Sequence, residues 1–228
     1  MHPRRYDEPA DTDADADTAP LRERLRHVLW IGGGSGAGKS TVARRLAERH
    51  GLSHYATDDV MRDHAARTTP QTAPRLHEFL AMDMDERWLN RPPPVMLETF
   101  HWFRGEGFDL IVEDLLRLPR ERRVVAEGFR LLPHLVRPLL ADPAHAVWLL
   151  PTPGFRRSAI LSRSLPEDGF IEQTSDPAKA RRNLAERDRL FTRHLAAEAD
   201  RLRLPTLHVD TSLSEDALTE RVATAFRL

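Results

Sequence analysis

The chain has 228 residues, of which 40% are hydrophobic, so it is long enough for one compact α/β domain with insertions. It contains no cysteine, which excludes disulfides and thiolate metal sites. No apolar run approaches the ~20 residues of a membrane span, and the N-terminus lacks the apolar stretch of a secretory signal. We therefore expect a cytoplasmic protein with no membrane partner.

The net charge of −1 is unevenly distributed along the chain. Residues 1–20 contain six acidic residues and two arginines, a net charge of −4 that leaves +3 on the remainder. Because this segment is also poor in apolar residues, we predict a disordered acidic tail at 1–20 before a single domain at 21–228. The small positive excess suits a phosphate pocket but not a nucleic-acid surface, so a nucleic-acid partner is not expected.

A strand, a glycine-rich loop and a helix follow one another after the tail. The apolar run 27–31 predicts the strand, and 41–49, with Val42 and Leu46 four residues apart, predicts the helix. The loop between them is a complete Walker A pattern, G-x-x-x-x-G-K-[ST]. Its residues are Gly33, Gly34, Ser35, Gly36, Ala37, Gly38, Lys39 and Ser40, followed by Thr41.

This context predicts a binding site for ATP. Glycines let consecutive backbone N–H groups turn inward at the positive end of a helix dipole, where they cradle phosphates. Lys39 would place a charge on the β- and γ-phosphates, and Ser40 would offer a hydroxyl to Mg²⁺. Lys39 is one of only two lysines in the chain, the other being Lys179. ATP and Mg²⁺ are therefore the expected cofactors.

An acidic pair follows the second predicted strand, 53–56. Asp58 and Asp59 should face the same crevice as the glycine loop, because ligands of doubly wound sheets bind at the carboxyl ends of the strands. Either carboxylate could accept a proton from a substrate hydroxyl or reach Mg²⁺ through water; Asp58 is preferred because it leaves the strand first. Arg62, one helical turn later, could hold a substrate group. The alternative is a helix cap, since aspartate is favoured there.

About 65 residues separate the second and third predicted strands, so we expect an insertion at about 60–122. Helical spacing predicts one helix from Leu76 to Trp88, and two more over 95–103 and 108–118, after a stop at three prolines. His101 lies in a His-Trp-Phe stretch that could line an acceptor pocket; the alternative places Trp102 and Phe103 in the core and His101 at the surface as a polar residue.

The third predicted strand, 124–127, ends in a carboxylate as a Walker B strand does. Glu127 would order Mg²⁺ or its waters, and Gly128 would let a substrate or the glycine loop approach the backbone closely. Arg130 is a further candidate substrate ligand.

Arginines cluster after the fourth predicted strand, 145–150. They flank a predicted polar loop at 166–176, with a helix before it from Thr152 to about 163 and a longer one after it at 177–204. The cluster comprises Arg156, Arg157, Arg163, Arg181, Arg182, Arg187 and Arg189. We expect a lid at about 156–189 that brings at least one arginine to the phosphates, with Arg182 and Arg187 as candidates. The alternative explanation is that these arginines lie on solvated helix faces, paired with Glu186 or Asp188. The last strand is predicted at 206–209, and a helix capped by Ser212 and Glu215 then runs to about 226.

These motifs, spread over about residues 27–227, resemble the P-loop small-molecule and nucleotide kinases, a group that includes shikimate kinase, gluconate kinase, chloramphenicol phosphotransferase and zeta-toxin-like kinases. The resemblance implies a three-layer α/β fold with a five-stranded parallel sheet in the order 2-3-1-4-5, a substrate-binding insertion and a lid. It also implies that Asp210 and Thr211 begin a loop that packs on adenine.

The expected activity is transfer of the γ-phosphate of ATP to a hydroxyl of a small molecule. A nucleotide-dependent switch without acceptor chemistry and a polynucleotide 5′-hydroxyl kinase are the alternatives. The near-neutral charge disfavours the second of these.

Overall fold

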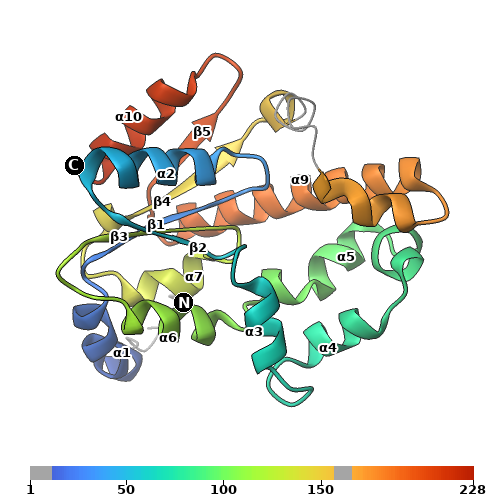
Figure 1. Ribbon diagram of the computed structural model, residues 1–228, viewed down its shortest axis with the longest axis horizontal. Helices are drawn as coiled ribbons and strands as arrows, with labels where there is room; N and C mark the ends of the chain where they lie inside the picture. The colour runs from blue at the N-terminus through green and yellow to red at the C-terminus, as the bar shows by residue number, and fades with distance from the viewer. Residues whose placement is uncertain (1–11, 157–165) are drawn as a thin grey trace, which may run out of the picture.

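The computed structural model describes residues 12–156 and 166–228, with side chains from residue 18 onward and, after the gap, from residue 169. At its centre are five parallel strands in the order β2-β3-β1-β4-β5 (Figure 1). The strands are β1 (Val28–Gly33), β2 (Ser53–Ala56), β3 (Val124–Glu127), β4 (Ala146–Pro151) and β5 (Thr206–Val209). The predicted fold class and sheet order are confirmed, and every predicted strand is present to within two residues at either end.

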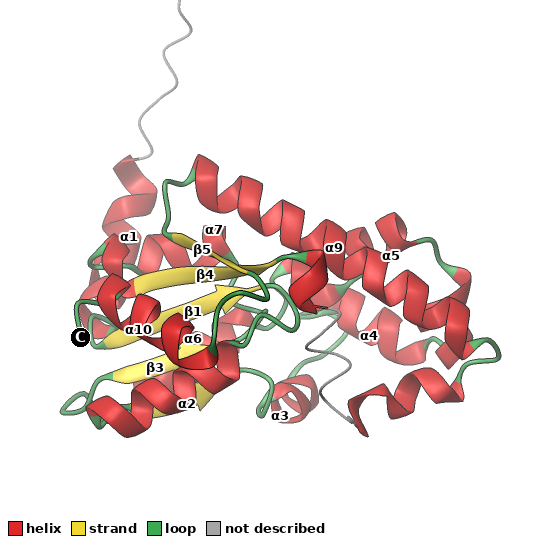
Figure 2. Ribbon diagram, turned by 90° about the horizontal axis from the view of Figure 1, so that it is seen from above, coloured by secondary structure: helices red, strands yellow, loops and turns green. Residues whose placement is uncertain are grey.

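The strands alternate their side chains between two separate apolar clusters. In β1, Val28 and Trp30 belong to one cluster, whereas Leu29 and Ile31 belong to the other. The smaller cluster is completed by α2 (Lys39–His50) and α10 (Glu215–Ala225), and the larger one includes α9 (Pro177–Arg201) (Figure 2). Both faces of the sheet are thus covered, which explains why the central strands read as continuous apolar runs.

The insertion is broken into more pieces than the sequence predicts. Its elements are α3 (Met61–Arg67), α4 (Pro74–Ala81), η1 (Glu86–Asn90), α5 (Pro93–Thr99), η2 (His101–Arg104) and α6 (Phe108–Arg117). The single helix predicted from Leu76 to Trp88 is wrong. Asp83 and Glu86 exchange side-chain-to-backbone hydrogen bonds of 2.8 and 3.3 Å, a reciprocal cap that ends one helical segment and starts the next.

The N-terminal boundary also differs from the prediction. Helix α1 (Thr12–Arg24) includes residues 12–20 of the predicted disordered tail, while residues 1–11 lie outside the described part of the chain. Its C-terminal end is anchored, because Leu25 is fully buried just after it and Arg22 Nε donates to the Pro138 carbonyl at 3.2 Å.

Several elements in the second half of the chain also differ from those predicted from the sequence. The loop predicted at 166–176 contains the 3₁₀ helix η5 (Pro166–Gln173), and α10 is capped by Ser214, not by Ser212. The helix predicted from Thr152 is helical up to residue 156, and its remainder, with Arg157 and Arg163, lies outside the described residues. Short helices α7 (Pro133–Val136), η3 (Arg137–Leu139) and η4 (Pro143–His145) link β3 to β4. None of the described helices is long and apolar enough to cross a bilayer.

Candidate active site

The glycines of the Walker A loop divide into two groups with different tasks. Gly33, still in β1 with φ +136°, could not carry a Cβ, because that atom would lie 2.2 Å from the Leu149 carbonyl oxygen. Gly34 is similarly tight, with Thr192 Oγ1 2.5 Å from such a Cβ. Gly36 and Gly38 instead have φ of +73° and +81°, the left-handed conformations that turn the loop. The first pair therefore packs the loop onto β4 and α9, and the second pair shapes the anion cradle.

Lys39 and Ser40 begin α2, at the positive end of its dipole. Lys39 is buried, and its Nζ donates a 2.9 Å hydrogen bond to the Gly34 carbonyl across the loop. The ammonium is thus held over the cradle, where an anionic phosphate would compete for it.

Two carboxylates converge on this lysine from the ends of β2 and β3. Glu127 is 2% exposed, and His54 Nε2 lies 3.8 Å from its Oε1. Burial alone would raise the pKa of Glu127, but His54, the charge of Lys39 and the Ser40 hydroxyl together hold it below its ordinary value. The pKa of Asp58 is raised, mainly by loss of hydration and also by Glu127, and Lys39 opposes the rise. Glu127 is thus favoured as an anion and Asp58 as a proton acceptor.

Ser40, Asp58 and Glu127 are chemically suited to Mg²⁺, which prefers oxygen ligands. Across the described residues there is no group of three or more histidine, aspartate or glutamate side chains that could hold a metal ion by itself. Mg²⁺ at nucleotide sites is usually held by one or two protein carboxylates, with phosphate oxygens and waters as its remaining ligands, and the set of Ser40, Asp58 and Glu127 fits that arrangement.

A cleft of about 520 Å³ opens beside the glycine loop and the acidic pair. It is lined, among the described residues, by Ser35, Asp58, Asp59, Met61, Trp88, Phe100, Phe103, Phe129, Phe170, Leu184, Arg187, Asp188 and Phe191. These residues come from the P-loop, the end of β2, the insertion, the residue after Gly128, η5 and α9. The cleft thus joins the predicted phosphate site to the insertion.

A buried arginine–carboxylate pair, Arg187 and Asp188, stands in the wall of this cleft, and Arg156, which does not line the cleft, joins it. Asp188 Oδ1 accepts from Nε and Nη2 of Arg187 at 2.9 and 2.6 Å, and its Oδ2 accepts from Arg156 Nη2 at 2.6 Å. Arg187 is 7% exposed, its guanidinium lies 4.7–5.4 Å from the ring centres of Trp88, Phe100 and Phe103, and its Nη1 is buried without a hydrogen-bond partner. We call Arg156, Arg187 and Asp188 the cleft network.

Two predicted substrate residues lie behind the cleft wall. Arg130 is 2% exposed, stacks 4.0 Å from the Trp102 ring centre and donates to the Gly107 carbonyl at 3.0 Å; burial lowers its pKa to about 10. His101 is also buried, and loss of hydration with three nearby arginines lowers its pKa to about 3, so it is neutral. Gly128 contacts Thr57 in place of a ligand, because a Cβ there would lie 1.7 Å from Thr57 Oγ1.

Other candidates lie at varying distances from the cleft. Asp59 lines it, whereas Arg62 is exposed on α3 and does not. Arg182 lines a neighbouring pocket of about 490 Å³, together with Arg156. Asp210 accepts a 2.8 Å hydrogen bond from the Ser212 backbone N–H, and the Ser212 hydroxyl and N–H lower its pKa; Thr211 beside it is exposed.

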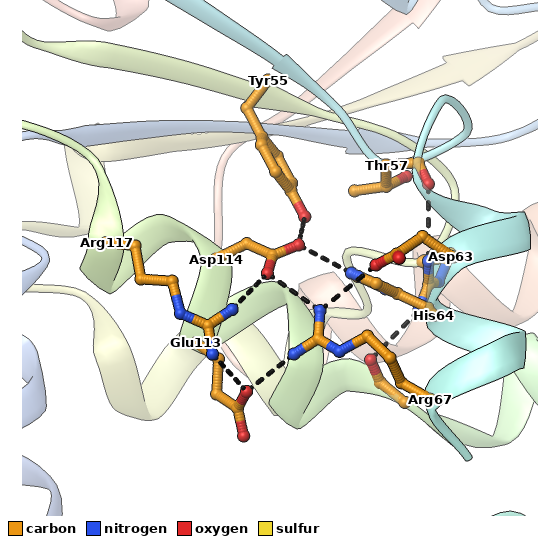
Figure 3. A network of polar contacts seen from close by, with 10 residues as sticks. Tyr55, Thr57, Asp63, His64, Arg67, Glu113, Asp114 and Arg117 are labelled. Atoms are coloured by element: carbon orange, nitrogen blue, oxygen red, sulfur yellow. Dashed lines mark hydrogen bonds and ion pairs between the residues drawn. The ribbon is translucent and has the colours of Figure 1, made fainter.

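A second polar network ties the insertion to the sheet (Figure 3). Asp114 on α6 accepts from Tyr55 Oη at 3.0 Å and from Arg67 Nη1 at 3.1 Å, and its Oδ2 lies 2.7 Å from His64 Nε2. Arg117 approaches the same carboxylate at 3.2 Å. We call Tyr55, His64, Arg67, Asp114 and Arg117 the scaffold network, because it joins β2, α3 and α6 and none of its members lines the cleft.

Sequence reasoning considered Asp188 only as an ion-pair partner of arginines on a solvated helix face, and it missed most of the aromatic wall. Asp188 is in fact buried beside Arg187. The rings come from segments as far apart as Phe103 and Phe191, which stack 3.6 Å apart at 7°. No local pattern signals such a pairing.

The chain is similar to several known proteins. A family profile described as an AAA domain matches residues 32–91. Adenylate kinase of Thermus thermophilus is 32% identical over 151 residues, 64% of this chain and 62% of that protein. Adenylate kinase of Deinococcus deserti is 34% identical over 101 residues, 39% of this chain and 51% of that protein, so this chain spans about half of its length. A solved protein from Eubacterium ventriosum, covering 89% of this chain and 98% of its own, has a TM-score of 0.46 and 14% identity.

The sheet order, the Walker A loop and the sequence matches together support a relationship with the P-loop kinases. They do not select one subfamily among them.

Proposed function

We propose that the protein transfers the γ-phosphate of ATP to a hydroxyl group of a small molecule. The observation that carries this proposal is the composition of one cleft, whose wall combines Ser35 of the P-loop, the Asp58–Asp59 pair and Arg187. A phosphate donor site, a candidate base and a cation for the migrating group are the parts that phosphoryl transfer needs.

In the proposed reaction the acceptor oxygen forms a bond to the γ-phosphorus while the bond from that phosphorus to the bridging oxygen breaks, releasing ADP. Asp58 takes the hydroxyl proton, a role that its raised pKa favours. Lys39 and the loop amides hold the triphosphate, and Arg187 offsets charge on the transferred group. Bound at Ser40 and Glu127, Mg²⁺ would supply charge neutralisation of the phosphate oxygens.

A second candidate is phosphorylation of a nucleoside monophosphate, because the Thermus and Deinococcus relatives are named adenylate kinases. The cleft favours the hydroxyl acceptor. Its described wall holds three carboxylates, Asp58, Asp59 and Asp188, and one guanidinium that Asp188 already engages. A phosphate-bearing acceptor there would meet repulsion at close range.

The test is acceptor-dependent ADP release by the full chain, measured with Mg·ATP and a panel of alcohols and nucleoside monophosphates. Lys39→Ala should weaken ATP binding, and Asp58→Asn should keep ATP binding but lose roughly 10²–10⁴ in rate, the usual contribution of a general base. Asp63→Asn, an exposed carboxylate on the next turn, is the matched control and should leave the rate unchanged.

Two outcomes would contradict the proposal. A wild-type protein that binds ATP yet releases no additional ADP with any acceptor would favour a nucleotide-dependent switch. Release that depends only on nucleoside monophosphates would favour the second candidate. Near-normal transfer by Asp58→Asn would move the base to Asp59 or remove it from the mechanism.

A further inference from the structure

The cleft concentrates the aromatic residues of the chain in one wall. Five of its nine phenylalanines and one of its four tryptophans are among the described lining residues. They are Trp88, Phe100, Phe103, Phe129, Phe170 and Phe191. Ligand pockets are mostly apolar with a few placed polar groups, and about 520 Å³ is within their usual volume range. The wall therefore has the composition of a binding site.

The rings are already packed against one another, so the wall is organised without a ligand. Phe103 stacks on Phe191, Phe100 meets Phe103 edge to face at 4.8 Å between ring centres, and Trp88 lies 4.9 Å from Phe170. An apolar ligand would displace water from these surfaces at little cost in side-chain ordering, since the rings hardly need to move.

The charges in the cleft exclude an anionic body. Asp58 and Asp59 line one part of the wall, and the positive charge of Arg187 is held by Asp188 and faced by three rings. Nε of Arg156 is also buried without a partner, but Arg156 lines the neighbouring pocket and not this cleft. Among the described residues that line the cleft, the only arginine nitrogen without a partner is Nη1 of Arg187. That one donor suits the transferred phosphoryl group, and nothing comparable remains for a carboxylate or phosphate on the acceptor.

We infer that the acceptor is an alcohol carried on an apolar, ring-bearing body without an anionic group. This inference rests on the proposed phosphoryl transfer and deepens it. The hydroxyl lies at Asp58, and the ring lies against Trp88, Phe103 and Phe170. Elements η1, η2, η5 and α9 carry four of the six rings, namely Trp88, Phe103, Phe170 and Phe191.

The experiment is a fluorescence titration of the full chain with Mg²⁺ and a non-hydrolysable ATP analogue. Trp88 reports on the cleft, because Trp30, Trp102 and Trp148 are buried outside its wall. The probes are 4-phenyl-1-butanol, xylitol and AMP at matched concentrations. We expect saturable quenching or enhancement with the phenyl alcohol and none with xylitol or AMP.

Two variants tie that binding to the rings. Phe103→Leu and Phe170→Leu should each raise the dissociation constant of the phenyl alcohol by about 3–10-fold, the effect of losing one ring contact. Phe170 is the less buried of the two, so its variant stays informative if Phe103→Leu fails to fold. Phe226→Leu, which lies in the other apolar cluster, is the control and should leave the constant unchanged.

The inference is overturned if xylitol or AMP binds more tightly than the phenyl alcohol. It is also overturned if the wild type, Phe103→Leu and Phe170→Leu bind the phenyl alcohol with the same dissociation constant. The titration involves no turnover, so the two proposals fail separately. If the phenyl alcohol binds in a ring-dependent way but no phosphoryl transfer occurs, the proposed function is contradicted, whereas the cleft is still a site that binds ring-bearing ligands. Transfer to polyols or nucleotides without ring-dependent binding would remove only the inference about the acceptor.

Discussion

Asp188 and Asp114 are each shared by two arginines, and the surroundings of these two carboxylates differ. Asp188 bridges Arg156 and Arg187 with a side chain that is 4% exposed, in the wall of the cleft. Asp114 bridges Arg67 and Arg117 with a side chain that is 18% exposed, between α3 and α6. The same ion-pair chemistry thus occurs both beside the candidate reaction centre and away from it.

The two networks differ in where their buried polar atoms without a hydrogen-bond partner lie. In the cleft network a guanidinium nitrogen of Arg187 is buried without a partner, which costs stability unless a ligand pairs with it. In the scaffold network, both oxygens of Asp114 accept from side chains on neighbouring elements, and Nδ1 of His64, which is also buried without a partner, belongs to a residue that does not line the cleft. We propose that the cleft network serves a ligand and that the scaffold network serves the fold. This proposal leads to four predictions.

The largest effect is expected for Asp188→Asn. It leaves the charges of Arg187 and Arg156 buried without their counterion, so the free energy of unfolding should fall by about 3–5 kcal/mol. The rate of phosphoryl transfer should also fall, because neither guanidinium stays in place. Urea unfolding and steady-state kinetics measure the two losses. A variant with the stability and turnover of the wild type would show that Asp188 orders nothing.

Arg187→Met should separate rate from stability. It removes a cation that the transition state would use, so kcat should fall by about 10²–10³, while the dissociation constant of ATP changes far less. Arg156 still neutralises Asp188, so the fold should persist. Arg189→Met, an exposed arginine of the same helix paired with Glu186, is the matched control. Equal kinetics in the two variants would remove Arg187 from the mechanism.

Asp114→Asn should show the opposite pattern. Loss of hydrogen bonds to charged groups should reduce the free energy of unfolding by about 1.5–3 kcal/mol. ATP affinity and kcat, measured well below the melting temperature, should stay within about twofold of wild type, because the scaffold network does not line the cleft. If the variant folds stably but has a much lower kcat, the scaffold network contributes to catalysis and this prediction is wrong.

The smallest effect concerns the buried His101 behind the cleft wall. Its pKa of about 3 in the folded state lies below its ordinary value of ~6.5, so the unfolded chain binds the proton first. The free energy of unfolding therefore decreases as the pH falls from the ordinary pKa of ~6.5 towards the folded-state pKa of about 3. His101→Phe should remove that part of the acid sensitivity and change turnover little at neutral pH. Melting temperatures of both proteins between pH 7 and pH 4 would test this, and parallel curves would contradict it.

The sequence alone predicted those parts of the structure that local patterns determine. Apolar runs predicted all five strands, and the spacing of Gly38, Lys39 and Ser40 predicted the loop at the start of α2. The sequence alone did not predict which polar residues are buried and therefore cannot contact a substrate. His101 and Arg130 are polar residues near motifs, and nothing in their neighbours reveals that they pack behind the wall. The Leu76–Trp88 helix was wrong because a local cap at Asp83 overrides the apolar spacing.

The most direct test of phosphoryl transfer to an alcohol is ³¹P NMR of the full chain with Mg·ATP, 4-phenyl-1-butanol and AMP in one sample. We expect resonances of ADP and of a phosphate monoester of the alcohol, both lost in Lys39→Ala. ADP formed from AMP with no new monoester would contradict the hydroxyl acceptor. ADP with inorganic phosphate as the sole other product would contradict transfer altogether.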